Sequence, residues 1–250
     1  MDLLLLVGAG IIAGAVNAAV GSGTLLTYPL LLAYGLPPVV ANGTNSAGLA
    51  PGNLFGALGY RREMAGRRRE VVPLALAIGG GALVGAILVV ALPASVFERI
   101  VPWFILLACV LVLVGPRITA SLRSRGLDPT TLPRHVLLPI LVVVGLYAGY
   151  FGAAQGIIIV AALTMLFDVD LQRSNAVKNV LQGVSNGVAA VVFAIAGAVA
   201  WLPALALAVG ASVGGAVGAP VARRLPAAAL RGLIVVVGVV AAVMSLRALQ

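Results

Sequence analysis

The sequence has few charged residues, and this scarcity excludes a soluble globular fold. Charged side chains make up 9% of the 250 residues, whereas hydrophobic residues make up 62%. A soluble domain of this length needs roughly a quarter of its residues charged to cover its surface. Long apolar runs, such as 71–92 and 101–114, occupy most of the chain instead. The sequence therefore predicts a protein embedded in a lipid bilayer.

Acidic residues are also scarce, and none lies inside an apolar run. All seven lie at or beyond the ends of the runs: Asp2, Glu63, Glu70, Glu98, Asp128, Asp168 and Asp170. A proton relay of carboxylates through the membrane is therefore not expected, nor is a cation site built on acids. The polar groups that remain within the runs are amides, hydroxyls and one ammonium, and these favour an anion.

Cysteine and histidine occur once each, which argues against several kinds of catalytic site. Cys109 lies inside an apolar run, where a thiol behaves as a small hydrophobe. A dyad of Ser22 with His135 is not expected, because His135 opens a different apolar run at its basic end. The chain shows no zinc or phosphate-loop pattern. We expect no metal, no cofactor and no enzymatic activity.

Positive charge is abundant, but its placement indicates a membrane rather than nucleic acid. The formal net charge is +9, and a basic chain can bind nucleic acid. The arginines here sit in short loops between apolar runs, which is where the positive-inside rule places them. We therefore expect the lipid bilayer as partner, and no nucleic acid.

The apolar runs predict an all-α bundle. Membrane spans are helices or closed barrels, because lipid offers the backbone no hydrogen-bond partners. The runs do not alternate as barrel strands do, so helices are predicted. Eight runs are long: Leu3–Val20, Val39–Tyr60, Val71–Leu92, Val101–Gly115, His135–Ala153, Ser174–Ala196, Trp201–Ala222 and Ala227–Leu246. Two runs, Leu25–Tyr34 and Ile157–Phe167, are about half as long as a span requires and predict broken or re-entrant helices.

An internal repeat divides the chain into two halves. Residues 13–21 align with 148–156 at five identical positions, and 41–45 align with 174–178. In each half the apolar segments then follow the same order of lengths: one long segment, one short segment and three long segments. We predict a first repeat over 1–116, a cytoplasmic linker over 117–134 and a second repeat over 135–250.

The basic residues predict that the two halves are inverted. If all ten segments cross, 14 lysines and arginines fall on one side and two, Arg99 and Arg247, on the other. If the short segments turn back instead, the split is 10 against 6. The first arrangement fits the positive-inside rule better and places both termini outside.

Polar residues within the runs gather near the two short segments. Such residues are costly in a membrane and are mostly functional. The predicted substrate-binding residues are Asn17, Gly21, Ser22, Gly23, Thr24, Asn42, Thr44, Asn45, Gln155, Gly156, Asn175, Lys178 and Asn179. Further polar residues of the same region are Ser46, Asn53, Ser174, Gln182, Ser185 and Asn186.

The glycine-rich stretches before the short segments have two interpretations. Glycines let backbone amides turn toward a bound group, and Ser22 or Thr24 is a good N-cap. Two helix N-termini near the midplane would suit an anion. Alternatively, the glycines simply allow close helix packing. Lys178 also has two interpretations. Its ammonium either neutralises a bound anion or snorkels to the cytoplasmic interface.

These motifs resemble the TauE/SafE sulfite exporter family. The resemblance rests on residues 13–23, Pro29, 35–38 and 41–45, and on 174–179 and 197–201 in the second half. The run Gly21–Gly23 contains fewer glycines than is usual, and its counterpart carries Gln155. The resemblance implies a multi-pass permease of a bacterial or archaeal inner membrane, with a sulfur-containing anion such as sulfite, a sulfonate or sulfoacetate as substrate.

Three functions follow as hypotheses. The first is a transporter that works by alternating access, the second a passive anion channel of the same architecture, and the third a membrane-embedded enzyme. The expected ligand is a small anion in each of the first two. Whether copies of the chain form a homo-oligomer is left open by the sequence.

Overall fold

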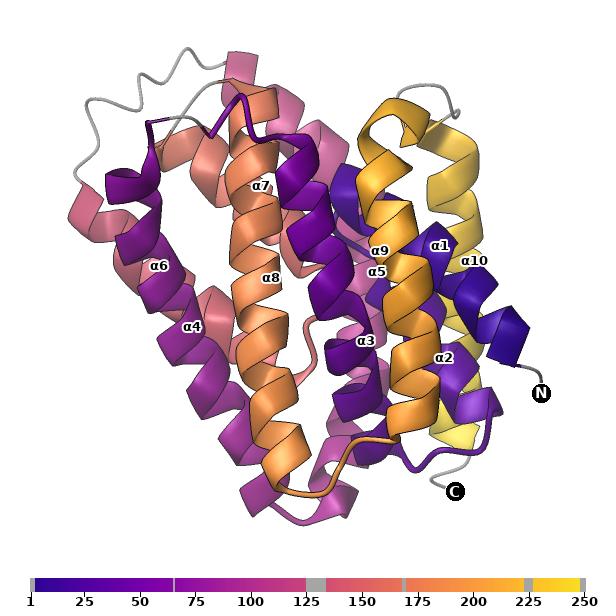
Figure 1. Cartoon of the computed structure of the whole chain (residues 1–250). Helices are drawn as coiled ribbons and strands as arrows, with labels where there is room; N and C mark the ends of the chain where they lie inside the picture. The colour runs from indigo at the N-terminus through magenta and orange to yellow at the C-terminus, as the bar shows by residue number, and fades with distance from the viewer. Residues whose placement is uncertain (1–2, 65, 125–133, 168–169, 223–226, 248–250) are drawn as a thin grey trace.

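The computed structural model describes residues 3–64, 66–124, 134–167, 170–222 and 227–247, and within them it is all-α (Figure 1). Ten helices follow one another in the predicted order. They are α1 Leu3–Ala19, α2 Thr24–Ala33, α3 Pro38–Gly59, α4 Arg68–Ala91, α5 Ala94–Ser124, α6 Arg134–Tyr150, α7 Gln155–Leu166, α8 Leu171–Ile195, α9 Trp201–Ala222 and α10 Ala227–Arg247. The two expected short segments are α2, of 10 residues, and α7, of 12.

Some helices extend beyond the apolar runs that predicted them. Helix α5 begins seven residues before Val101 and continues to Ser124, past Pro116 and into the predicted linker. Helix α8 begins at Leu171, where the Asp170 carboxylate accepts hydrogen bonds from the backbone N–H groups of Gln172 and Arg173 at 2.8 and 3.2 Å. An apolar run marks the part of a helix whose side chains are buried in lipid or in the protein core. The helix itself can continue beyond that run until its backbone groups are capped. The rest of the predicted linker, 125–133, lies outside the described residues.

Three of the described helices contain windows that are long and apolar enough to span a membrane by themselves: Arg68–Ala91, Ala94–Gly115 and Trp201–Gly218. Many large apolar side chains of the bundle face outward, among them Leu4, Leu76, Val143 and Ile195. In water such a surface would be unfavourable, whereas a bilayer accommodates it. The chain is a helical membrane protein.

Glycines form two close helix crossings. Gly10 and Gly14 of α1 face Gly210 and Gly214 of α9; a Cβ on Gly14 would lie 2.3 Å from the Ala211 carbonyl oxygen. The second crossing joins α4 to α6 through Gly81 and Gly85 on one side and Gly145 and Gly149 on the other. Glycines at four-residue spacing let backbones approach this closely. Close packing therefore explains these glycines, which lie outside the glycine-rich stretches before the two short helices.

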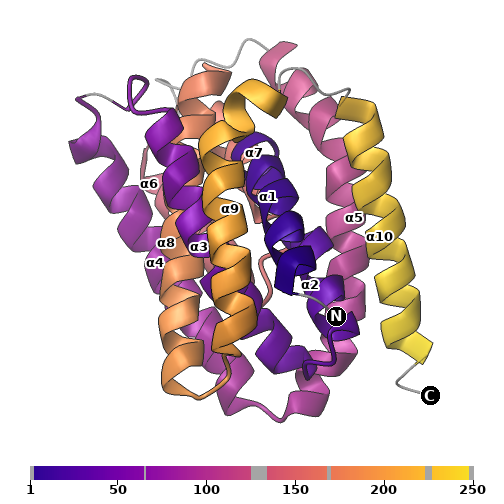
Figure 2. The ribbon, with the colours of Figure 1, turned by 45° about the vertical axis from the view of Figure 1, so that its right-hand side comes forward.

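The helix contacts of one half have counterparts in the other. Exchanging α1–α5 with α6–α10 converts the α1/α9 contact into α6/α4, α3/α9 into α8/α4, and α5/α7 into α10/α2, and all of these pairs pack. Helix α3 packs on α8 and α5 packs on α10, each with its own counterpart. Figure 2 shows α5 and α10 side by side at one edge of the bundle. This pattern is what a two-fold repeat would produce, and the inversion of the halves across the membrane stays a prediction.

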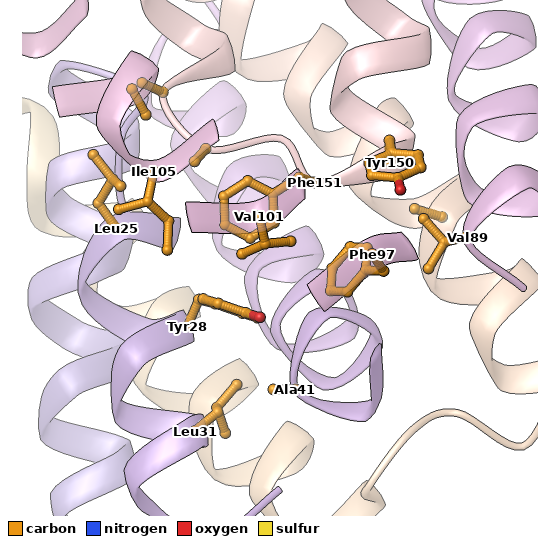
Figure 3. Close-up of a cluster of buried hydrophobic side chains, with 14 of the residues drawn as sticks. Leu25, Tyr28, Leu31, Ala41, Val89, Phe97, Val101, Ile105, Tyr150 and Phe151 are labelled. Carbon is orange, nitrogen blue, oxygen red and sulfur yellow. The ribbon is translucent and has the colours of Figure 1, made fainter. Parts of the chain in front are cut away.

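A buried aromatic cluster fills the space between α2, α5 and the end of α6. The Tyr28 ring packs edge-on against Phe151, with centroids 4.9 Å apart, and Phe97 lies beside both Tyr150 and Phe151 (Figure 3). Cys109 is buried in the same hydrophobic cluster, as expected for a thiol in an apolar run.

Candidate functional site

Two helix breaks meet in the interior of the bundle. The first lies between α1 and α2, where Gly21 has φ +82°, and the second lies between α6 and α7, where Gly152 has φ +71°. These left-handed conformations favour glycine, which explains the glycines at both turns. The Gly156 N–H donates to the Gly21 carbonyl oxygen at 3.2 Å. A Cβ on Gly156 would lie 2.5 Å from the Gly21 Cα, so the two breaks touch backbone to backbone.

The N-terminus of α2 is capped by a residue of α1. The Asn17 Oδ1 accepts a hydrogen bond from the Gly23 N–H at 2.6 Å. Gly23 occupies the N-cap position and no side chain of its own caps the helix. The expectation that Ser22 or Thr24 caps α2 is therefore wrong. The chain reverses direction at Gly21, which brings the last turn of α1 beside the first turn of α2 and places the Asn17 amide within reach.

Lys178 is fully buried, with 0% of its surface exposed. Its Nζ donates to the backbone carbonyl oxygens of Asn17 at 2.8 Å and Ala18 at 3.0 Å. Snorkelling to the interface is therefore wrong. These carbonyls belong to the last turn of α1, which carries a partial negative charge and lacks partners within its own helix. The ammonium of the second half thus caps a broken helix of the first half.

A corresponding contact runs in the opposite direction. Asn42 of α3 donates from Nδ2 to the Tyr150 carbonyl oxygen, the last residue of α6, at 2.9 Å. Each broken helix is therefore capped at its C-terminus by a polar side chain from the long helix of the other half. The cap of α1 is a charged ammonium, whereas the cap of α6 is a neutral amide. The positive charge therefore lies at the first break only.

Helix α3 also ties down α2. The Asn45 Nδ2 donates to the Thr24 Oγ1 at 3.2 Å, and the Asn45 Oδ1 accepts from the Thr27 hydroxyl. Thr44, the neighbour of Asn45, points elsewhere, because its Oγ1 accepts from the Ala200 N–H just before α9 at 2.9 Å. The structure thus brings Asn45 to the break and assigns Thr44 to the start of α9.

Helix α8 lines the other side of the breaks with amides. The Asn179 Nδ2 donates to the Ala18 carbonyl oxygen at 3.4 Å, and the Gln182 Nε2 to the Gly21 carbonyl oxygen at 3.5 Å. Gln155, the first residue of α7, donates to the Asn186 Oδ1 at 3.1 Å and accepts from the Ser185 hydroxyl at 2.9 Å. Asn175, nearer the start of α8, is only partly buried.

Four residues join this cluster without being among the predicted binding residues. They are Thr27, Gln182, Ser185 and Asn186, all buried. A signal for two of them exists in the sequence, since Gln182 and Asn186 follow the predicted Asn179 at spacings of three and four and so share its helix face. Thr27 is one turn beyond Gly23 on the short helix, but only the fold shows that it faces Asn45.

Several buried polar atoms at the breaks have no protein partner among the described residues. They are Ser22 Oγ, Asn179 Oδ1, Gln182 Oε1 and Asn186 Nδ2. Leaving such a group unsatisfied costs about 1–3 kcal/mol. Groups of this kind are normally satisfied by water or by a bound solute. Lys178 is the only charged side chain buried in the described part of the chain, so the cluster is electropositive.

The fold and the site together define a helical membrane protein with two broken helices meeting at a buried polar cluster. Such an arrangement is characteristic of secondary transporters. The profile of the sulfite exporter TauE/SafE family matches residues 6–245, and the chain belongs to this family. It is a membrane transporter.

Relatives of the chain carry the same kind of description. A probable membrane transporter protein of Haemophilus influenzae is 29% identical over 184 residues, which cover 72% of this chain and 70% of the relative. The probable membrane transporter protein ORF9 of a Sinorhizobium species is 30% identical over 59% of this chain and 55% of its own length. The Escherichia coli K12 probable membrane transporter protein YfcA is 27% identical over 68% of this chain and 62% of its own length. No solved structure matches the chain significantly.

Proposed function

We propose that this transporter carries a small sulfur-containing anion, such as sulfite, a sulfonate or sulfoacetate, across a bacterial or archaeal inner membrane. The observation that carries the proposal is the buried cluster at the two breaks, whose only charge within the described residues is the Lys178 ammonium. Among the unpaired buried atoms at the breaks, Ser22 Oγ and Asn186 Nδ2 can donate, whereas Asn179 Oδ1 and Gln182 Oε1 are acceptors. Oxyanions accept hydrogen bonds on every oxygen, so they suit the ammonium and the two unpaired donors, and Asn179 and Gln182 would turn their amide N–H groups toward a bound anion. The sulfur class comes from the family name.

The bound anion would sit between the start of α2 and the amide face of α8. There it would meet the Lys178 ammonium, the Gly23 and Thr24 backbone amides and the Ser22 hydroxyl, together with Asn45, Asn179 and Gln182. Because the Asn17 amide oxygen now occupies the Gly23 N–H, an anion would displace that cap. Asn42, Gln155 and Gly156 would position the second break and would not contact the anion. Thr44 would not contact it either, because its hydroxyl binds the backbone just before α9.

Alternating access is favoured over a passive channel by the contact between the breaks. The backbones of Gly21 and Gly156 touch, which closes any straight path between them. Passage of an anion then requires the two halves to move relative to each other, as a carrier does. The inverted arrangement of the halves is part of the proposal.

Flux measurements on the purified protein in proteoliposomes test this function. We expect saturable sulfite uptake with counterflow, and an Asn45→Ala variant with a KM several-fold higher, because Asn45 holds the start of α2 in place. Ser212→Ala is the matched control, since the Ser212 hydroxyl donates to the Ala208 carbonyl oxygen of its own helix at 2.7 Å, away from the breaks. Absence of flux for sulfite, thiosulfate, sulfonates and sulfoacetate would overturn the substrate class, and uptake without counterflow would indicate a channel.

A further inference from the structure

An apolar cavity lies away from the polar cluster, between α2, α5 and α10. Its volume is about 630 Å³, which is within the range of small-molecule sites. The inner wall is formed by Tyr28 and Val101, which belong to the buried aromatic cluster of Figure 3. Tyr28 is 1% exposed and packs on Phe151. This wall separates the cavity from the helix breaks, so the cavity is not part of the proposed anion site.

The cavity opens sideways, toward the surface that lipid covers. Val236 and Val240 of α10 line it and are 61% and 53% exposed. Figure 2 shows α5 and α10 at the edge of the bundle, where no further helix covers them among the described residues. A hydrocarbon chain can therefore enter from the bilayer without unfolding any element.

The polar groups of the cavity are at one end. Helices α5 and α10 are antiparallel, because Cys109 contacts the Val235 carbonyl oxygen while Glu98 and Ser245 both line the cavity. Glu98 lies in the second turn of α5 and Ser245 in the last turn of α10, so both are near helix ends. Val236 and Val101 line the part nearer the middle of these helices. The cavity is polar at the membrane boundary and apolar below it, like a lipid.

The charges select among lipids. Among the described residues that line the cavity, Glu98 alone is charged, and a carboxylate attracts an ammonium group and repels an anionic headgroup. Arg99 follows it at the same helix end and is exposed, so a cation is available for a phosphate. We propose that this cavity binds one phospholipid with an ethanolamine headgroup, its ammonium at Glu98 and an acyl chain along Val236 and Val240.

Native mass spectrometry of the delipidated, detergent-purified full chain tests the proposal. Phosphatidylethanolamine and phosphatidylglycerol with identical acyl chains are offered at equal concentration. We expect the first to be retained at least several-fold more than the second. Glu98→Gln should bring the ratio close to one, and Val240→Trp should reduce retention of both lipids by filling the cavity. Val239→Trp, on the neighbouring exposed position that does not line the cavity, should bind as the wild type does.

Three results of the same experiment would overturn the proposal. Equal retention of the two lipids by the wild type would mean ordinary contact with bulk lipid and would overturn the proposal. The same holds for an ethanolamine preference that survives Glu98→Gln, and for efficient displacement of the phospholipid by decylamine, which would assign a free amphiphilic amine instead. Glu98→Gln changes one charge in a partly exposed side chain, so the test remains decisive even if Val240→Trp does not fold.

Discussion

At the residue scale, the burial of Lys178 is the feature that most constrains the site. An ammonium within a membrane bundle is costly unless it is well paired. Here it caps the carbonyls of Asn17 and Ala18, where a cation at a helix C-terminus contributes up to about 2 kcal/mol. The same charge would attract a substrate anion. Lys178 therefore has both a structural role and a proposed binding role, and these can be separated by substitution.

Lys178→Gln should separate them. The glutamine amide still donates to the carbonyls of α1 but carries no charge, so we expect a Tm close to that of the wild type and a KM for sulfite raised about tenfold, equivalent to about 1.4 kcal/mol. Lys178→Met removes the donor as well and should lower the Tm clearly, since it leaves buried carbonyls unpaired. Differential scanning fluorimetry and proteoliposome flux measure the two effects. Wild-type kinetics in Lys178→Gln would leave Lys178 as a helix cap only.

At the element scale, two crossings of parallel helices, α1 with α9 and α4 with α6, are among the most extensive contacts of the bundle. Both rely on glycines that bring one backbone against another. Without a hydrophobic driving force between helices in lipid, such close packing is a main source of association energy. Each crossing joins helices from different halves, so it also fixes the halves to each other.

A pair of adjacent glycines on α4 offers a matched test of this packing. A Cβ at Gly81 would lie 2.0 Å from the Val142 carbonyl oxygen, whereas one at Gly80 would meet nothing within 4 Å. We expect Gly81→Ala to destabilise the protein by about 1–3 kcal/mol through overpacking. Gly80→Ala should be neutral or stabilising by up to about 1 kcal/mol, because alanine is the better helix former. Thermal unfolding in detergent measures both, and equal Tm values for the two variants would contradict the crossing.

At the scale of the whole molecule, the most extensive helix contacts have counterparts when the halves are exchanged. Five segments in each half give an odd number of crossings, which inverts the second half if every segment crosses. The broken helices would then enter from opposite sides and meet where Gly21 contacts Gly156. This geometry would let one half rock against the other about a fixed site.

Cysteine labelling distinguishes ten crossings from eight. In a Cys109→Ser background, single cysteines replace Ser95, Ala196 and Arg62, and intact cells are treated with an impermeant maleimide. Ser95→Cys should label and Arg62→Cys should not under either topology. Ala196→Cys, in the exposed turn after α8, should label only if all ten segments cross, because the turn is then external. An unlabelled Ala196→Cys that reacts after permeabilisation would show that the short segments turn back.

The sequence alone determined the class of protein and the order of its helices, because both depend on local properties. Apolar runs too long and too poor in charge for water predict spans, and the two short runs predicted α2 and α7. The glycines of the breaks were equally evident, since a left-handed turn favours that residue. Buried amides in otherwise apolar runs marked the region of the site.

Only the tertiary structure decided which partner each polar group has. Lys178 and the carbonyls of Asn17 and Ala18 are about 160 residues apart in sequence, and no local pattern encodes a contact between the two halves. The tertiary structure also decided that Asn17, and not Ser22 or Thr24, caps α2. It likewise decided that Thr27 faces Asn45. The scarcity of charge that predicts a membrane protein also explains this difference: with so few polar groups inside, each one acquires its role from the helix that packs against it.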